Sequence, residues 1–137
     1  MKARAVVATM LLLIMSVASV FATVRIQDDS GGQIGEYLAR YQALRVSGDQ
    51  VVIDSTCASA CTMLRNRICV TPRAVLAFHS AWDPTTGGNV ASGAGNQILW
   101  SNYPSNVRKW ISRNGGLRSR IIYLRGPALY AMFPICH

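Results

Sequence analysis

The apolar and polar residues in the first part of the chain follow two different periods. Residues 23–27 alternate apolar and polar side chains, which predicts a short strand. From residue 33 the apolar positions recur at helical spacing as far as Gly48, and the apolar run 51–53 predicts a buried strand. A strand, a glycine turn, a helix and a second strand form a crossover unit, so this pattern predicts a parallel sheet.

The pattern continues with shorter elements after residue 54. Small and polar residues predict a short helix at 59–65, and Pro72 lies in a turn between two strand patterns. The glycine-bearing stretch 83–95 is typical of a surface loop. The remaining elements that the pattern predicts are strands at 68–70, 74–78 and 121–124, and helices at 97–101, 104–113 and 127–133.

The first 22 residues differ in composition from the rest. Lys2 and Arg4 precede an apolar run, and Val20-Phe21-Ala22 has the small residues of a signal-peptidase site. The sequence therefore predicts a signal peptide at 1–22 and one domain at 23–137, in the periplasm or secreted. The alternative is an uncleaved apolar segment that tethers the chain to a membrane.

The chain is basic, with a formal charge of +8 that falls to +6 without Lys2 and Arg4. Such a surface could meet anionic lipid, a cell-wall polymer or nucleic acid. The basic residues are scattered, however, and do not interleave with aromatic residues as in strand-binding modules. The sequence therefore favours a solvated basic face and predicts no specific nucleic-acid partner.

Four cysteines, Cys57, Cys61, Cys69 and Cys136, predict two disulfides in an exported chain, because its compartment is oxidising. Three pairings are open. The weakly favoured pairing joins Cys61 to Cys69 and Cys57 to Cys136. A zinc site made by three cysteines with His79 or His137 is the alternative.

The stretch 54–79 contains the candidate chemistry. Ser59 follows a strand at a turn where a hydroxyl can stand above a sheet, and His79 ends a later strand from which it can reach that hydroxyl as a general base. The competing interpretation makes Ser59 a helix cap and His79 a half-buried structural residue.

Three motifs in order carry a resemblance to a known superfamily. They are Ser30-Gly31-Gly32 after one strand, Cys57-Ala58-Ser59-Ala60-Cys61-Thr62 after the next, and Arg73-Ala74-Val75-Leu76-Ala77-Phe78-His79. The chain resembles the proteolytic subunit of Clp proteases and the crotonases, most closely the small exported Clp-like proteins of alphaproteobacteria. The resemblance covers nearly all of 23–137. It implies a compact α/β fold of repeated strand-strand-helix units with a mainly parallel sheet, here with disulfides added.

The resemblance also implies a catalytic role for each matching residue. Ser59 would be the nucleophile, His79 its base, and the backbone amides of Gly31 and Ala60 the oxyanion hole. The chain departs from the family in two ways. Asp83 is the only acidic residue after His79, so it is a weak candidate for the orienting acid, and the segment from Ser59 to His79 is shorter than in the family.

These expectations predict a serine hydrolase or peptidase that acts on a peptide or other acyl substrate through an acyl-enzyme, with no metal and no cofactor. Related assemblies form rings or trimers, so a homo-oligomer is also expected, and a membrane contact is expected only through an uncleaved signal segment. The alternative function is a non-catalytic exported scaffold or binding module of the same fold.

Overall fold

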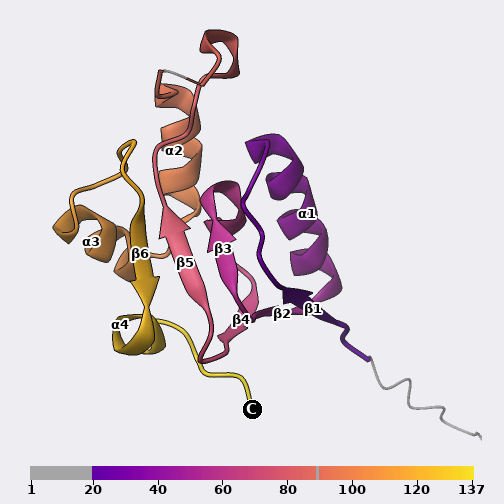
Figure 1. The fold of residues 1–137 in the computed structure, drawn as a ribbon. Coiled ribbons are helices and arrows are strands. Elements are labelled where there is room, and N and C mark those ends of the chain that lie inside the picture. The colour runs from indigo at the N-terminus through magenta and orange to yellow at the C-terminus, as the bar shows by residue number, and fades with distance from the viewer. Residues whose placement is uncertain (1–19, 89) are drawn as a thin grey trace, which may run out of the picture.

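The computed structural model describes residues 20–88 and 90–137, which form an α/β fold with two three-stranded sheets (Figure 1). The predicted signal peptide at 1–22 lies outside the described residues except for its last three positions. Within the described ranges, no helix has the length and apolar character needed to cross a bilayer.

The first sheet contains β1 (Thr23–Ile26), β2 (Gln50–Ile53) and β4 (Arg67–Val70), all parallel, with β2 in the middle. The middle strand is buried on both faces, which explains its unbroken apolar run. Helix α1 (Ile34–Ser47) links β1 to β2 and ends at Gly48, whose positive φ of 74° closes the last turn. The predicted parallel crossover is therefore confirmed.

The second sheet contains β3 (Thr56–Ala58), β5 (Val75–Phe78) and β6 (Ile122–Arg125). β3 pairs with β5 in parallel, and β5 pairs with β6 in antiparallel orientation. The pattern of the sequence did not predict β3. This three-residue strand has backbone partners on both edges, because Asp29 donates to Thr56 and accepts from Ala58, each at 2.8 Å.

Short helices complete the fold: the 3₁₀ turns η1 (Ser59–Thr62) and η2 (Pro84–Thr86), and the helices α2 (Gly93–Asn102), α3 (Ser105–Arg113) and α4 (Gly126–Tyr130). The predicted helix at 59–65 is only the single turn η1. The predicted loop 83–95 is also shorter than expected, because Ser92 caps α2 by accepting a hydrogen bond from the Gly95 amide.

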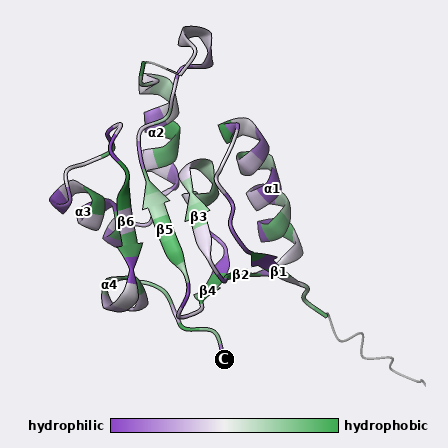
Figure 2. Cartoon of the chain, in the orientation of Figure 1, coloured by the Kyte–Doolittle hydropathy of each residue, from purple (hydrophilic) through white to green (hydrophobic). Residues whose placement is uncertain are grey.

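The core is made by apolar residues of both sheets and of the helices that cover them. Phe78 of β5 contacts the ring of Tyr103 at 5.3 Å between centroids and that of Trp110 at 6.0 Å, which holds α3 on the second sheet. Tyr103 is buried, whereas Trp82 and Trp100 remain 40% and 36% exposed. In Figure 2 the hydrophobic residues colour much of β5 and β6 green.

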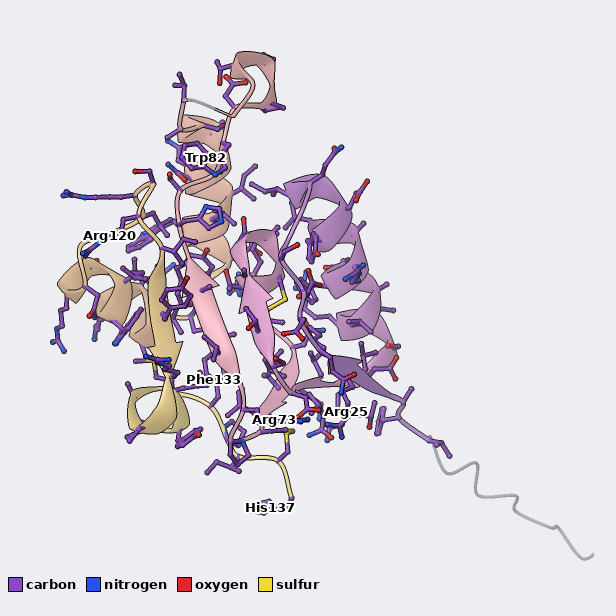
Figure 3. All side chains as sticks on the ribbon, in the orientation of Figure 1. Arg25, Arg73, Trp82, Arg120, Phe133 and His137 are labelled. Carbon is purple, nitrogen blue, oxygen red and sulfur yellow. A yellow bond between two sulfur atoms is a disulfide. The ribbon has the colours of Figure 1, made fainter. Side chains whose placement is uncertain are left out.

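The buried carboxylate of Asp54 lies between β2 and β3, where the chain passes from one sheet to the other. It accepts hydrogen bonds from Arg73 at 2.7 Å, Arg25 at 2.9 Å and Gln27 at 3.1 Å. The bond from Arg73 is the largest cause that holds the pKa of Asp54 well below its usual range. Figure 3 shows Arg25 and Arg73 near each other on this side of the molecule.

The two expected disulfides are present, but the favoured pairing was wrong: Cys57 joins Cys61, and Cys69 joins Cys136 (Figure 3). The turn η1 brings the Cα atoms of Cys57 and Cys61 to 5.4 Å. Residues 134–136 run beside β4, with hydrogen bonds from Val70 to Pro134 and from Cys136 to Val70, and this places Cys136 next to Cys69. The pairing leaves no thiolate for the alternative zinc site, and it is consistent with an extracellular or periplasmic protein.

Candidate functional site

Ser59 occupies a strained turn between β3 and η1. Its φ of 54° lies in the left-handed region, which costs a residue other than glycine about 1–2 kcal/mol. The Cys57–Cys61 disulfide spans this turn, and we call residues 57–61 the Ser59 turn. A nucleophilic serine needs such a sharp turn if its hydroxyl is to stand clear of its own strand.

Two neighbouring helices hold the Ser59 turn from the inside. Tyr41 of α1 donates a hydrogen bond of 2.6 Å to the carbonyl of Cys61, and burial raises the pKa of that tyrosine. The hydroxyl of Thr62 donates to the carbonyl of Ser59 at 2.5 Å and also contacts the hydroxyl of Tyr103 at 3.1 Å. Because these partners are buried, the backbone of Ser59 is fixed although its side chain is partly exposed.

Gly31 packs directly against the Ser59 turn. Its φ is 84°, and a Cβ atom at this position would lie 2.6 Å from the carbonyl oxygen of Ala58 and 2.8 Å from Cβ of Ser59. A residue with a side chain would therefore meet both backbone strain and a clash. The structure thus places the Gly31 segment beside Ser59, next to the amide of Ala60.

The two amides predicted for the oxyanion hole are in different states. The Gly31 amide donates to Oδ1 of Asp29 at 2.9 Å, so it is already paired within the protein. Ala60 is the second residue of η1, and the first amides of a helix have no acceptor inside it. The Ala60 amide is therefore a candidate donor, although Ala60 is fully buried in this conformation, and the Gly31 amide would first have to release Asp29.

Asp29 lies in the turn between β1 and α1, and the sequence did not predict a role for it in the site. Besides the Gly31 amide, its carboxylate accepts a short hydrogen bond from the Tyr37 hydroxyl and pairs with Arg40 at 3.5 Å. Burial and the bond to Asp29 raise the pKa of Tyr37 to about 12. A carboxylate in the turn after a strand, two residues before a glycine, is the signal that could have marked it.

His79 directly follows β5, the strand next to β3. In the parallel register Ala58 lies opposite Ala77, so Ser59 and His79 leave neighbouring strands at the same edge of the sheet. Neighbouring strands are about 5 Å apart, so the shortened segment between Ser59 and His79 still leaves both residues at the ends of adjacent strands. Within the described residues, however, no hydrogen bond joins the Ser59 hydroxyl to the His79 ring.

The His79 ring is oriented by a backbone group. Its Nδ1 lies 2.7 Å from the carbonyl oxygen of Ser80. A carbonyl can only accept a hydrogen bond, so Nδ1 carries the proton and Nε2 of the neutral ring is left to accept one. This is the tautomer that a general base needs.

Asp83 does not orient His79 as predicted. Its Oδ1 accepts hydrogen bonds from the amide of Thr85 at 2.8 Å and from the Thr85 hydroxyl at 2.6 Å, and so caps η2. The bond from the Thr85 hydroxyl is the main reason why the pKa of Asp83 is lowered. The local bonds available to an aspartate two residues before a backbone amide compete with the longer reach to His79.

Ser59 borders a pocket of about 490 Å³. Its walls come from the start of α1, from the segment after β5 and from α2, and include Ile34, Gly35, Trp82 and Ile98. No lining residue is ionisable. The His79 ring lies 6.3 Å from the ring of Trp82, which lines the pocket and is labelled in Figure 3, but His79 is not itself a lining residue.

The site therefore combines a serine in a braced turn, a histidine in the tautomer of a base, one candidate oxyanion donor and an apolar pocket. Such a set can transfer an acyl group once the side chains of Ser59 and His79 turn toward each other, because catalytic hydrogen bonds often tighten only with substrate. No protein-family model, no curated protein and no solved structure was found to match this chain.

Proposed function

We propose that this chain is an exported serine hydrolase of the Clp-protease and crotonase type, which cleaves a peptide or another acyl bond through an acyl-enzyme. The observation that carries the proposal is the left-handed backbone of Ser59 at the border of a pocket, on the strand beside the one that leads to His79. A serine used only as a helix cap has no need of that backbone strain.

The proposed fold relationship is supported by the order of the elements. β2 of the first sheet is followed by β3 of the second and then by η1, and β4 is followed by β5 and then by η2 and α2. This order supports the proposed strand-strand-helix repeat, with the single turn η1 in the place of the first helix. The proposed export depends on the signal peptide at 1–22.

In the proposed reaction, Oγ of Ser59 attacks the acyl carbonyl carbon while Nε2 of His79 takes the hydroxyl proton. The new C–O bond gives a tetrahedral oxyanion, for which the Ala60 amide is the candidate donor once the substrate reaches it. When the oxyanion collapses, the bond to the leaving group breaks, and His79 returns the proton to that group. Water then repeats the two steps on the acyl-enzyme and releases the acid and Ser59.

Two features make this a slow enzyme. The Ser80 carbonyl sets the tautomer of His79, but it lacks the full charge with which a carboxylate stabilises the imidazolium, and loss of the orienting acid can cost about four orders of magnitude. The second feature is the Gly31 amide, which is paired to Asp29; a missing oxyanion donor costs about two to three orders of magnitude.

The test is covalent labelling of the oxidised protein with a fluorophosphonate, in which the serine oxygen bonds to phosphorus and fluoride leaves. We expect mass spectrometry to find one adduct on Ser59, lost in Ser59→Ala and in His79→Ala. Ser112→Ala and His137→Ala are matched controls on exposed residues outside the site, and both should be labelled like the wild type. A folded wild type that remains unlabelled would contradict the proposal.

The second candidate is a non-catalytic scaffold. Two observations on the described residues favour it: the Gly31 amide is paired with Asp29, and no hydrogen bond joins Ser59 to His79. This candidate predicts that Ser59 of the folded wild type carries no adduct, and that Ser59→Ala changes only stability.

A further inference from the structure

The net charge of the chain is not spread evenly along the sequence. Between residues 23 and 83, six basic residues are balanced by all six acidic residues of the protein. Between residues 84 and 137 there are six basic residues and no acidic one: Arg108, Lys109, Arg113, Arg118, Arg120 and Arg125. The whole positive excess of 23–137 therefore belongs to its second part.

The fold gathers three of these six side chains at one place. Arg108, Lys109 and Arg113 of α3 line a surface hollow of about 370 Å³, together with Trp100 and the serines at 105 and 112. Among the residues that the structure describes, ion pairs are made by Arg25, Arg40 and Arg73, and none involves these three. Arg120 lies in the segment that links α3 to β6 (Figure 3).

Trp100 connects this basic hollow to a second hollow. The second one has a volume of about 340 Å³ and is lined by Trp100 and Leu117 with neutral polar residues. The indole of Trp100 is 36% exposed. A cationic hollow and an apolar wall that share one tryptophan are the two halves of a site for an amphipathic anion.

We propose that this surface, which we call the Trp100 face (Trp100, Arg108, Lys109, Arg113 and Leu117), binds the anionic phospholipid surface of a membrane. The phosphodiester lies in the basic hollow, while Trp100 and Leu117 enter the boundary between headgroups and acyl chains. A single-stranded nucleic acid fits less well, because it needs several stacking aromatics in a row and the face has one.

The Trp100 face is separate from the Ser59 pocket although both use α2. Ile98 lines the pocket and Trp100 lines the face. Residues two positions apart in a helix lie about 200° apart around its axis, so the side chains of Ile98 and Trp100 leave opposite sides of α2. The proposal therefore does not depend on catalysis by Ser59, and it gives the chain a membrane contact that does not need an uncleaved signal segment.

The experiment measures co-sedimentation of the oxidised full chain with vesicles of phosphatidylcholine alone or mixed with an equal part of phosphatidylglycerol. Lys109→Gln with Arg113→Gln removes two exposed charges from the face, and Arg45→Gln with Arg67→Gln removes two exposed charges elsewhere. Both variants keep residues 1–22, so binding through that segment is common to them.

Each basic residue near an anionic surface strengthens binding about fivefold, so the Lys109/Arg113 variant should bind mixed vesicles about twentyfold more weakly than the wild type. The Arg45/Arg67 variant should bind them within about threefold of the wild type. Trp100→Ala should weaken binding to vesicles but not to soluble polyphosphate. Equal losses in both charge variants, or no preference for phosphatidylglycerol, would overturn the proposal. Loss of polyphosphate binding in Trp100→Ala, or tighter binding to single-stranded DNA than to vesicles, would also overturn it.

Discussion

The two disulfides perform different tasks. Cys57–Cys61 joins residues four apart and encloses Ser59, whereas Cys69–Cys136 joins residues 67 apart and fastens the 134–136 segment to the edge strand β4. A long loop loses more entropy on closure than a short one, so the chain-entropy model assigns about 4 kcal/mol of stability to the second bond and about 2 kcal/mol to the first. The short bond therefore matters mainly for the geometry of the Ser59 turn.

The largest effect is expected when each bond is removed by a pair of alanines. Cys69→Ala with Cys136→Ala should lower the free energy of unfolding by about 4 kcal/mol, and Cys57→Ala with Cys61→Ala by about 2 kcal/mol, as measured by urea denaturation. The rate of fluorophosphonate labelling should show the reverse order. Since a displacement of about 1 Å can cost two orders of magnitude, the Cys57/Cys61 variant should label about a hundredfold more slowly, and the other variant nearly normally.

If both variants lost stability and labelling in the same proportion, the division of tasks between the two disulfides would be wrong. Thermal unfolding of each variant shows the temperature below which labelling reports on the folded protein.

A smaller effect should come from the glycine that packs on the Ser59 turn. Gly31→Ala adds a methyl group within 2.8 Å of Cβ of Ser59 at a φ of 84°, and we expect a loss of about 3 kcal/mol. Gly88→Ala is the matched control, because its φ is 80° but no atom lies within 4 Å of the new Cβ. Its expected loss is about 1 kcal/mol. Equal losses in the two variants would mean that the turn yields to the methyl group.

The last effect appears only in acid and concerns Asp54, which precedes β3, whereas Ser59 follows that strand. The folded pKa of Asp54 is depressed, so its contribution is fully present above the pKa of an unfolded carboxyl, about 4, and is lost as pH falls below that value. Urea midpoints measured between pH 5 and 2 should therefore fall more steeply for the wild type than for Asp54→Asn. A parallel course for the two proteins would contradict the assignment.

Much of the fold could be predicted because its elements repeat a period. The strand at 23–27, the helix that ends at Gly48, the strands around residues 52 and 76 and the helix at 104–113 all carry an apolar pattern long enough to identify them. β3 has only three residues, so it shows no period. Its place depends on hydrogen bonds with Asp29, which lies 27 residues before Thr56 in the chain. Tertiary pairing of this kind leaves no local signal.

The candidate site divides in the same way. Ser59 and His79 could be singled out because each follows a strand, and parallel neighbours then bring their ends together. The roles of their partners could not be predicted, because Asp83, Asp29 and the Gly31 amide each had more than one partner within reach. For Asp83 and the Gly31 amide, a bond within a few residues won over a longer one, since it orders less of the chain, whereas Asp29 also bonds Tyr37, eight residues away.

The sequence by itself determined the composition of the core, the parallel crossover, the presence of two disulfides and the positions of Ser59 and His79, because these depend on local period and residue type. Only the tertiary structure decided which cysteines pair, which group orients His79, and that three cations of α3 share a hollow with Trp100. These features depend on distances between segments far apart in the chain, which the packing of the whole core sets.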